Sequence, residues 1–225
     1  KPAAKPDFDI KPEQSTGCKH HEGALDKKDE TLMIDDKGGV ANVVLTISDI
    51  DSDLNNVTVS AISSNPNLIA NPVPVTGTGP NPSLALTPLP DAYGKAIITL
   101  VAEDDQSART TNSFLLTVTA VNDRPSFELS TELVTVVEDA PAQKLAGFAL
   151  NLSAGPPNES SQKLSFSLTN DFKALFATQP AIDTNGALSF KPALNATGDA
   201  LVTAFLLDSG GTANGGINRS VPQTF

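Results

Sequence analysis

Two stretches of this chain repeat one another, and the repeat constrains the fold more than any other feature. Residues 83–104 (SLALTPLPDAYGKAIITLVAED) align without a gap on residues 187–208 (ALSFKPALNATGDALVTAFLLD), at an offset of 104 residues. Seven of the 22 aligned pairs are identical: Leu84 and Leu188, Pro88 and Pro192, Ala92 and Ala196, Gly94 and Gly198, Ala96 and Ala200, Thr99 and Thr203, and Asp104 and Asp208. Because single domains are commonly about 100 residues long, this offset predicts two copies of one module.

The repeated block has a clear physical meaning. A short strand ends at a proline, which cannot donate to a β-ladder, and a loop of small residues then turns at a glycine. A long apolar strand follows and stops at an aspartate, so we expect Asp104 and Asp208 to be exposed. Between the two copies lies the short polar sequence VNDRP, residues 121–125, which predicts a linker between two compact units.

Apolar residues alternate with polar ones from Gly39 onwards, which is the periodicity of half-buried strands. The predicted inward-facing sets are Val43, Leu45 and Ile47; Val57, Val59 and Ala61; Leu84 and Leu86; Ile98, Leu100 and Ala102; and Phe114, Leu116, Val118 and Ala120. Turn-forming residues separate these strands, and no amphipathic helix lies between them. The sequence therefore predicts an all-β chain of two tandem β-sandwiches.

The predicted boundaries follow from the repeat and the linker. Residues 1–38 are expected to form a polar, largely irregular N-terminal segment, residues 39–123 the first sandwich and residues 124–225 the second. Thr224 and Phe225 correspond to Ser113 and Phe114, and nothing downstream corresponds to residues 115–121. We therefore expect the second sandwich to lack most of its last strand and to leave an unpaired edge.

Charge limits the classes of partner. The formal net charge is −11 and no Lys or Arg cluster occurs, which argues against nucleic acid and against an anionic membrane surface. No run of about 18 apolar residues is present, so no membrane insertion is expected within this fragment.

A single cysteine excludes an intrachain disulfide. The first residue is Lys1, and we expect the chain to be a mature or excised piece of a longer protein.

Several motifs resemble one family. Residues 114–125, ending in VNDRP, are similar to the last strand and linker of bacterial cadherin-like and immunoglobulin-like tandem repeats, whose linkers read VNDAP. Residues 48–53, 63–69, 134–143 and 150–162 resemble the same repeats. The resemblance implies immunoglobulin/cadherin-like sandwiches and a non-catalytic structural or adhesive spacer, secreted or on a bacterial cell surface. Its implied partners are the other modules of one large surface protein and a cell-surface or matrix ligand.

Residues 1–47 carry a second resemblance, through the stretch CKHHEGALDKKDETLMIDDKGGVANVVLTI at residues 18–47. This stretch is similar to the opening of a planctomycete-type plastocyanin-like (cupredoxin) domain. The later copper-binding loop of that family has no counterpart here, so its copper function does not carry over. Cys18, His20 and His21 lie within four residues, a spacing that cannot surround one copper ion in trigonal geometry.

Acidic residues form the candidate calcium ligands. Asp49, Asp51 and Asp53 alternate along DIDSD, and Asp104 ends a strand. A second set is predicted at the junction between the modules: Asn122, Asp123, Asp208 and Glu159. Calcium takes six to eight oxygen ligands from such side chains and from backbone carbonyls. The alternative is that these carboxylates are solvated turn residues that keep the surface soluble.

Catalysis is not predicted. The two histidines are adjacent near the N-terminus and support no Ser-His-Asp arrangement. A carbohydrate- or copper-binding module of a larger secreted protein is the alternative to a spacer. Sugar platforms need exposed aromatic rings, whereas the chain has no Trp and one Tyr, and its ten Phe lie mostly at apolar strand positions. This distribution favours the spacer.

Overall fold

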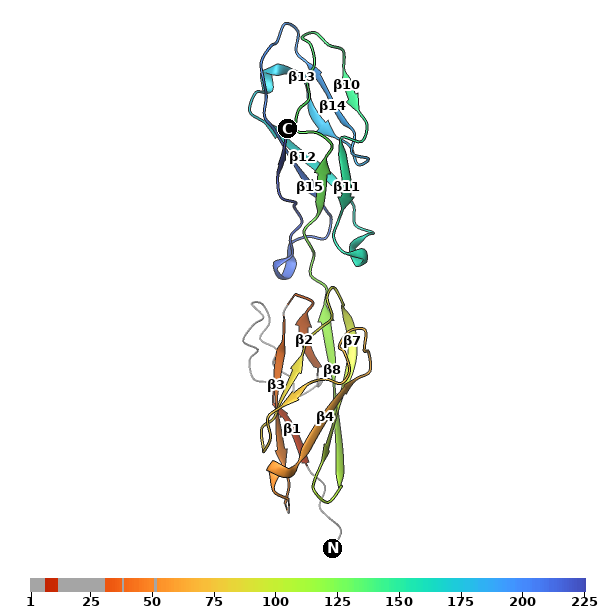
Figure 1. Cartoon of the computed structure of the whole chain (residues 1–225), viewed down its shortest axis with the longest axis vertical. Helices are drawn as coiled ribbons and strands as arrows, with labels where there is room; N and C mark the ends of the chain where they lie inside the picture. Colours follow the sequence, from red (N-terminus) through yellow and green to blue (C-terminus); the bar gives the residue numbers. More distant parts are fainter. Residues whose placement is uncertain (1–6, 12–30, 38, 51) are drawn as a thin grey trace. The chain divides into compact units, whose positions relative to one another are not determined.

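The computed structural model describes residues 7–11, 31–37, 39–50 and 52–225, and these fold into two compact units. The first unit ends at Val121 and the second begins at Asn122. Within the described residues the regular structure consists of β-strands and four short 3-10 helices, as Figure 1 shows. No described helix has the length and apolar character needed to cross a membrane.

Two sheets make up the first unit. One sheet has the order β1-β3-β6-β5 and is antiparallel throughout; the other has the order β2-β8-β7-β4, in which β2 runs parallel to β8. The strands are β1 (Asp7–Lys11), β2 (Thr31–Asp35), β3 (Ala41–Ser48), β4 (Thr58–Ser63), β5 (Val75–Thr76), β6 (Ser83–Leu86), β7 (Gly94–Glu103) and β8 (Arg109–Thr119).

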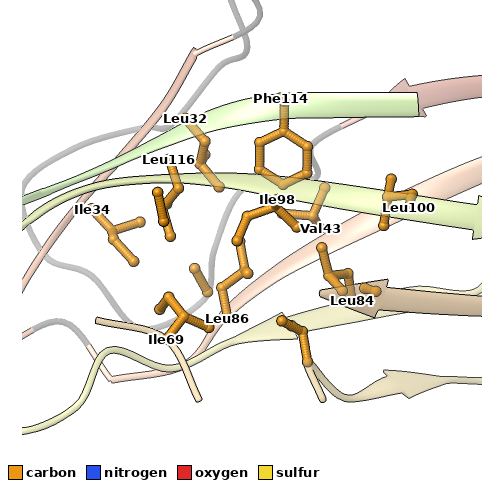
Figure 2. Packing of buried hydrophobic residues seen from close by; sticks show 14 of the residues in the cluster. Leu32, Ile34, Val43, Ile69, Leu84, Leu86, Ile98, Leu100, Phe114 and Leu116 are labelled. Carbon is orange, nitrogen blue, oxygen red and sulfur yellow. The ribbon is translucent and has the colours of Figure 1, made fainter. Parts of the chain in front are cut away.

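The core of the first unit lies between its two sheets. Figure 2 shows side chains from both sheets meeting there, among them Val43 and Leu84 from one sheet and Ile98 and Leu116 from the other. Residues of β3 alternate between buried and less buried positions, as a strand with one face on a core requires. The predicted inward-facing residues of β3, β6, β7 and β8 are buried, except Ala120, which lies beyond the end of β8.

Strands begin earlier in the first unit than the alternating pattern from Gly39 suggests. β1 pairs with β3, and β2 pairs with β8, so two parts of the predicted N-terminal segment 1–38 belong to the sandwich. In β2, Leu32 and Ile34 are 4% and 7% exposed. These strands are only five residues long and lie in a charged stretch, so their two-residue period is too short to stand out in the sequence.

The second unit contains three small sheets. Their orders are β11-β9, β10-β14-β13 and β12-β15-β16, all antiparallel. The strands are β9 (Ser126–Leu129), β10 (Gln143–Leu145), β11 (Ala149–Ser153), β12 (Ser165–Asn170), β13 (Phe176–Ile182), β14 (Leu188–Pro192), β15 (Val202–Leu207) and β16 (Gln223–Thr224). Leu188, Ala204 and Leu206 are 0% exposed in its core, and Phe148 is 1% exposed.

Edge-to-face aromatic pairs tie this second core together. Phe127 contacts Phe166 with ring centroids 5.1 Å apart, and Phe148 contacts Phe225 at 4.7 Å. Such pairs add about 0.5–1.5 kcal/mol beyond the area that they bury. The Phe residues of the second unit therefore contribute mainly to its core.

The two units share one plan. Leu84 in β6 and Leu188 in β14 are both fully buried, and the long strand of each repeated block becomes β7 in one unit and β15 in the other. A 3-10 helix follows the equivalent strand in each unit: η1 (Leu54–Asn56) after β3 and η2 (Pro157–Glu159) after β11. The remaining 3-10 helices are η3 (Lys173–Leu175) and η4 (Ala213–Gly215).

Candidate functional site

Asn122, the first residue of the second unit, is the centre of a polar network at one end of that sandwich. Its Nδ2 donates to Asp208 Oδ1 and to the carbonyl oxygen of Ile217, each at 3.0 Å. Its Oδ1 accepts from Gln162 Nε2 at 2.7 Å, and its carbonyl accepts from the Ile217 amide at 3.1 Å. These bonds fix the start of the second unit against the loops that follow β11 and β15.

Asp208 lies where β15 ends, and it is 9% exposed. Its Oδ1 accepts from the Gly210 amide at 2.9 Å as well as from Asn122, whereas Oδ2 is buried and accepts no hydrogen bond from the described residues. Gln162 Oε1 is a second buried oxygen of this kind. One carboxylate oxygen of Asp208 thus has two donors, and the other has none among the described residues.

Glu159 brings a second buried carboxylate to the same end. It closes η2, is 6% exposed, and accepts the Asp123 amide on Oε1 at 2.9 Å. Gly155 makes room for it, because a Cβ at that position would overlap Glu159 Oε2 and lie 3.0 Å from Asp123 Cβ. The structure thus gathers Asn122, Asp123, Glu159 and Asp208, the four residues predicted for the junction set, at one end of the second unit.

Asp53 and Asp104, two candidate ligands of the first unit, organise turns, and Asp104 Oδ2, like Asp208 Oδ2, is a buried oxygen with no hydrogen-bond partner among the described residues. Asp53 caps η1, accepting the Asn55 amide and side-chain Nδ2 at 3.0 Å each. Asp104 Oδ1 accepts the Gln106 and Ala108 amides at 2.9 and 2.7 Å, closing the turn between β7 and β8. Asp49 follows β3 and is half-buried, and Asp51 lies outside the described residues.

The predicted exposure of Asp104 and Asp208 is wrong. Asp104 is 5% exposed and Asp208 9%, although each follows the last residue of a strand. The reason is that each carboxylate folds back over its own turn and accepts backbone amides two or more residues further along. An aspartate at a strand end is therefore buried by the turn that it organises.

Sequence reasoning did not identify Gln162, Gly155 and Gly210 as parts of this end. A Cβ at Gly210 would overlap Asn122 Oδ1, so that position requires glycine as long as Asn122 keeps its place. For the two glycines, the signal in the sequence is their position soon after a strand: Gly155 follows β11, and Gly210 follows β15.

The metal-binding chemistry of this end depends on oxygen donors. Over the described ranges, no group of three or more His, Cys, Asp and Glu side chains is arranged to hold a metal ion. The second-unit end instead combines the carboxylates of Asp208 and Glu159 with the amide oxygen of Gln162 and nearby backbone carbonyls. Hard cations such as calcium accept such mixed oxygen sets. Cys18, His20 and His21 lie outside the described residues.

Comparison with known proteins bears on the fold. No family model and no curated protein matches the chain. A crystal structure of human protocadherin-24 EC1-2 matches 99% of this chain and 96% of its own length, with 17% identity and a TM-score of 0.51. A second crystal form of the same protein matches 99% of this chain and 97% of its own length, with 18% identity and a TM-score of 0.55. At these identities the likeness shows the fold, and the chain is built from two tandem cadherin-like β-sandwiches.

Proposed function

We propose that this chain is a non-catalytic, extracellular spacer of a bacterial surface protein and that calcium stiffens it. One observation carries the proposal. Four polar side chains lie together at the end of the second sandwich that contains its first residue: Asn122, Asp123, Glu159 and Asp208. Asn122 directly follows Val121, the last residue of the first unit, so an ion held there would order the residues that connect the modules.

Burial explains why a cation suits this end. Asp208 Oδ2 and Gln162 Oε1 are buried oxygens with no donor, and Glu159 is a buried carboxylate. Neighbouring carboxylates repel one another when no cation is present, and a divalent ion replaces that repulsion with shared coordination. Asp208 and Glu159 would supply the charge, while Gln162 would supply a neutral oxygen.

Tandem organisation supports the spacer role. The chain repeats one module, and the match with protocadherin-24 EC1-2 extends over nearly its whole length. The VNDRP linker, which resembles the VNDAP linkers of bacterial tandem repeats, supports a bacterial surface protein. The partners of such a spacer are the other modules of the same protein and a cell-surface or matrix ligand.

A calcium titration followed by differential scanning calorimetry tests the proposal. An ion that binds only the folded form stabilises it by RT ln(1 + [L]/Kd), which is about 2.7 kcal/mol at a hundredfold excess over Kd. We expect calcium to raise the Tm of the second unit. We also expect calcium to narrow the range of orientations between the units, which residual dipolar couplings measure.

The double variant Asp208→Asn with Glu159→Gln is the informative one, because it removes both buried charges and keeps oxygen acceptors for Gly210, Asn122 and Asp123. It should lose the calcium-dependent rise in Tm. The matched control, Asp105→Asn with Glu132→Gln, removes two exposed charges elsewhere and should retain the rise. If millimolar calcium produces neither heat nor a shift in the unmutated chain, these carboxylates are not a calcium site.

A further inference from the structure

Strand β12, labelled in Figure 1, lies at the edge of a sheet in the second unit. It pairs with β15 on one side and with no described strand on the other. On β15, the Leu206 carbonyl accepts the Ser220 amide at 2.9 Å, on the side away from β12. Leu206 stands opposite Phe166, and opposite residues that do not bond to each other direct their backbone groups outward on both strands. The amides and carbonyls of Phe166 and Leu168 therefore face the free side of β12, where no described residue bonds to them.

The equivalent edge of the first unit is closed. β4 occupies the place of β12, because each pairs with the long strand of its repeated block, β7 or β15. The Ala61 carbonyl, equivalent to that of Leu168, accepts the Val73 amide at 3.0 Å. Next to it, the Ser63 backbone exchanges two hydrogen bonds with the Asn71 side chain, at 2.6 and 2.9 Å. The described residues of the second unit make no such contacts with the backbone of β12.

The sequence of β12 lacks the features that usually protect an edge. Natural edge strands are commonly shielded by charged side chains, prolines or β-bulges. β12 reads SFSLTN, without charge or proline, and its register with β15 runs without a shift from Ser165 to Asn170. The pairing of β13 with β14, by contrast, contains shifts. β12 thus presents a regular row of unpaired backbone groups that another strand can extend.

A charged residue of opposite sign flanks each end of β12. Lys163 lies two residues before the strand and Asp171 directly after it, and both are exposed. The Lys163 amide donates to Ser209 Oγ at 3.0 Å, and the Asp171 amide donates to the Leu201 carbonyl at 3.3 Å. Both residues thus continue the register of β12 along β15, and the two-residue period places their side chains on the same face as that of Ser167.

We propose that β12 pairs antiparallel with β12 of a second copy of this chain, across a two-fold axis at Ser167. In this register Phe166 of each copy stands opposite Leu168 of the other, and each such pair exchanges two backbone hydrogen bonds. Their half-buried side chains meet on the core face of the joined sheets. Lys163 of each copy stands opposite Asp171 of the other on the outer face. This self-association goes beyond the spacer function and does not depend on calcium.

Charge favours this register and this partner. A shift by two residues is the smallest that keeps outward-facing backbone groups opposite one another, and it brings Lys163 opposite Thr169 or towards Lys173. Opposite charges on facing strands stabilise the pairing, and like charges destabilise it. Since a base precedes β12 and an acid follows it, an antiparallel copy of the same strand matches both charges at once. Such self-complementarity is what an isologous interface requires.

Sedimentation equilibrium of the full chain tests the pairing, with a chelator present so that a calcium site plays no part. A single pair of edge strands buries less surface than a standard interface, so we expect a weak dimer with a Kd of about 0.1–1 mM. Hydrogen exchange needs no variant: the Phe166 and Leu168 amides should exchange more slowly at about 1 mM chain than at about 10 µM. A chain that stays monomeric at about 1 mM, or a dimer without this protection, would overturn the proposal.

Exchanging the charges tests the register. Lys163→Glu and Asp171→Lys each place like charges opposite one another in their own dimers, so each variant alone should associate about tenfold more weakly than the unmutated chain. An equimolar mixture restores both contacts between opposite charges and should associate about as strongly as the unmutated chain.

The matched controls make the same changes of charge at exposed positions away from β12. Lys191→Glu, Asp199→Lys and their mixture should each keep the Kd of the unmutated chain within about twofold. If Lys163→Glu and Asp171→Lys associated no more strongly together than apart, the antiparallel register would be wrong. Equal weakening by the control variants would show that net charge, and not this edge, governs the association, and would likewise refute the proposal.

Discussion

Aspartates that follow strands organise the turns of both units. Asp104, Asp183 and Asp208 each accept backbone amides two or more residues further along the chain, which is the hydrogen bonding of an Asx-turn. The sequence shows that these residues end strands, but it does not show which way their side chains point. Whether such a carboxylate faces water or its own turn depends on backbone geometry, and for this reason the exposure of Asp104 could not be predicted.

Asp104→Ala should destabilise the first unit. The substitution leaves the Gln106 and Ala108 amides without their acceptor in the turn between β7 and β8, and a hydrogen bond to a charged group contributes about 1.5–3 kcal/mol. Chemical denaturation with urea measures the loss. Asp104→Asn keeps the accepting oxygen and should restore most of it, while Asp105→Ala, an exposed neighbour, should have no measurable effect. A loss of equal size at Asp105 would contradict this account.

Asp183 adds a pH dependence to the second unit. Hydrogen bonds from the Ala187 and Asn185 amides hold the pKa of its carboxyl below the ordinary value of 3.8. A carboxylate with a lowered folded-state pKa contributes stability above its unfolded pKa, and that stability is lost as the pH falls through the folded value.

We therefore compare the unmutated chain with Asp183→Asn, which keeps the accepting oxygen and lacks the charge. The unmutated chain should have the higher Tm at neutral pH, and the difference should shrink as the pH falls below 3.8. Thermal melts over that range isolate Asp183, because every other carboxylate is common to both proteins. A difference that stays constant down to the lowest pH would refute the assignment.

At the scale of elements, alternation predicted the long strands well. Val43, Leu45 and Ile47 of β3, and Ile98, Leu100 and Ala102 of β7, are buried as expected, because a strand that covers a core must alternate. β1 and β2 were missed because five residues in a charged stretch hold too few periods to be recognised. The edge position of β16 was visible only through the repeat, which aligned Phe225 with Phe114.

The sequence predicted some of the residues that meet at the candidate site, but not the geometry in which they meet. Position in the repeat and linker pointed to Asn122, Asp123 and Asp208, since strand ends and linkers meet at the ends of a sandwich. Their contacts also depend on three residues that the sequence did not point to. Gln162 donates a hydrogen bond to Asn122, and Gly155 and Gly210 leave space where a Cβ would overlap Glu159 and Asn122. A single sequence does not reveal contacts of this kind.

On the scale of the whole molecule, the repeat implies two units that are stabilised separately. Each unit has its own hydrophobic core, one built around Leu84 and the other around Leu188, and each core cluster draws its residues from one unit only. The offset of 104 residues predicted this duplication, because about 100 residues is a common length for one domain.

Leu84→Ala and Leu188→Ala test this independence, because the repeat makes them equivalent substitutions at fully buried sites. Removing a buried leucine costs about 2–5 kcal/mol, and each kcal/mol lowers the Tm of a domain of this size by about 4–8 °C. Each variant should therefore lower the Tm of its own unit by roughly 10 °C or more and leave the other within about 1 °C. Calorimetry resolves two transitions in such a case, and the intensity of amide signals from each unit during heating assigns them. If Leu84→Ala lowered the Tm of both units equally, the two sandwiches would unfold as one cooperative unit. That result would contradict the inference that each unit is stabilised by its own core.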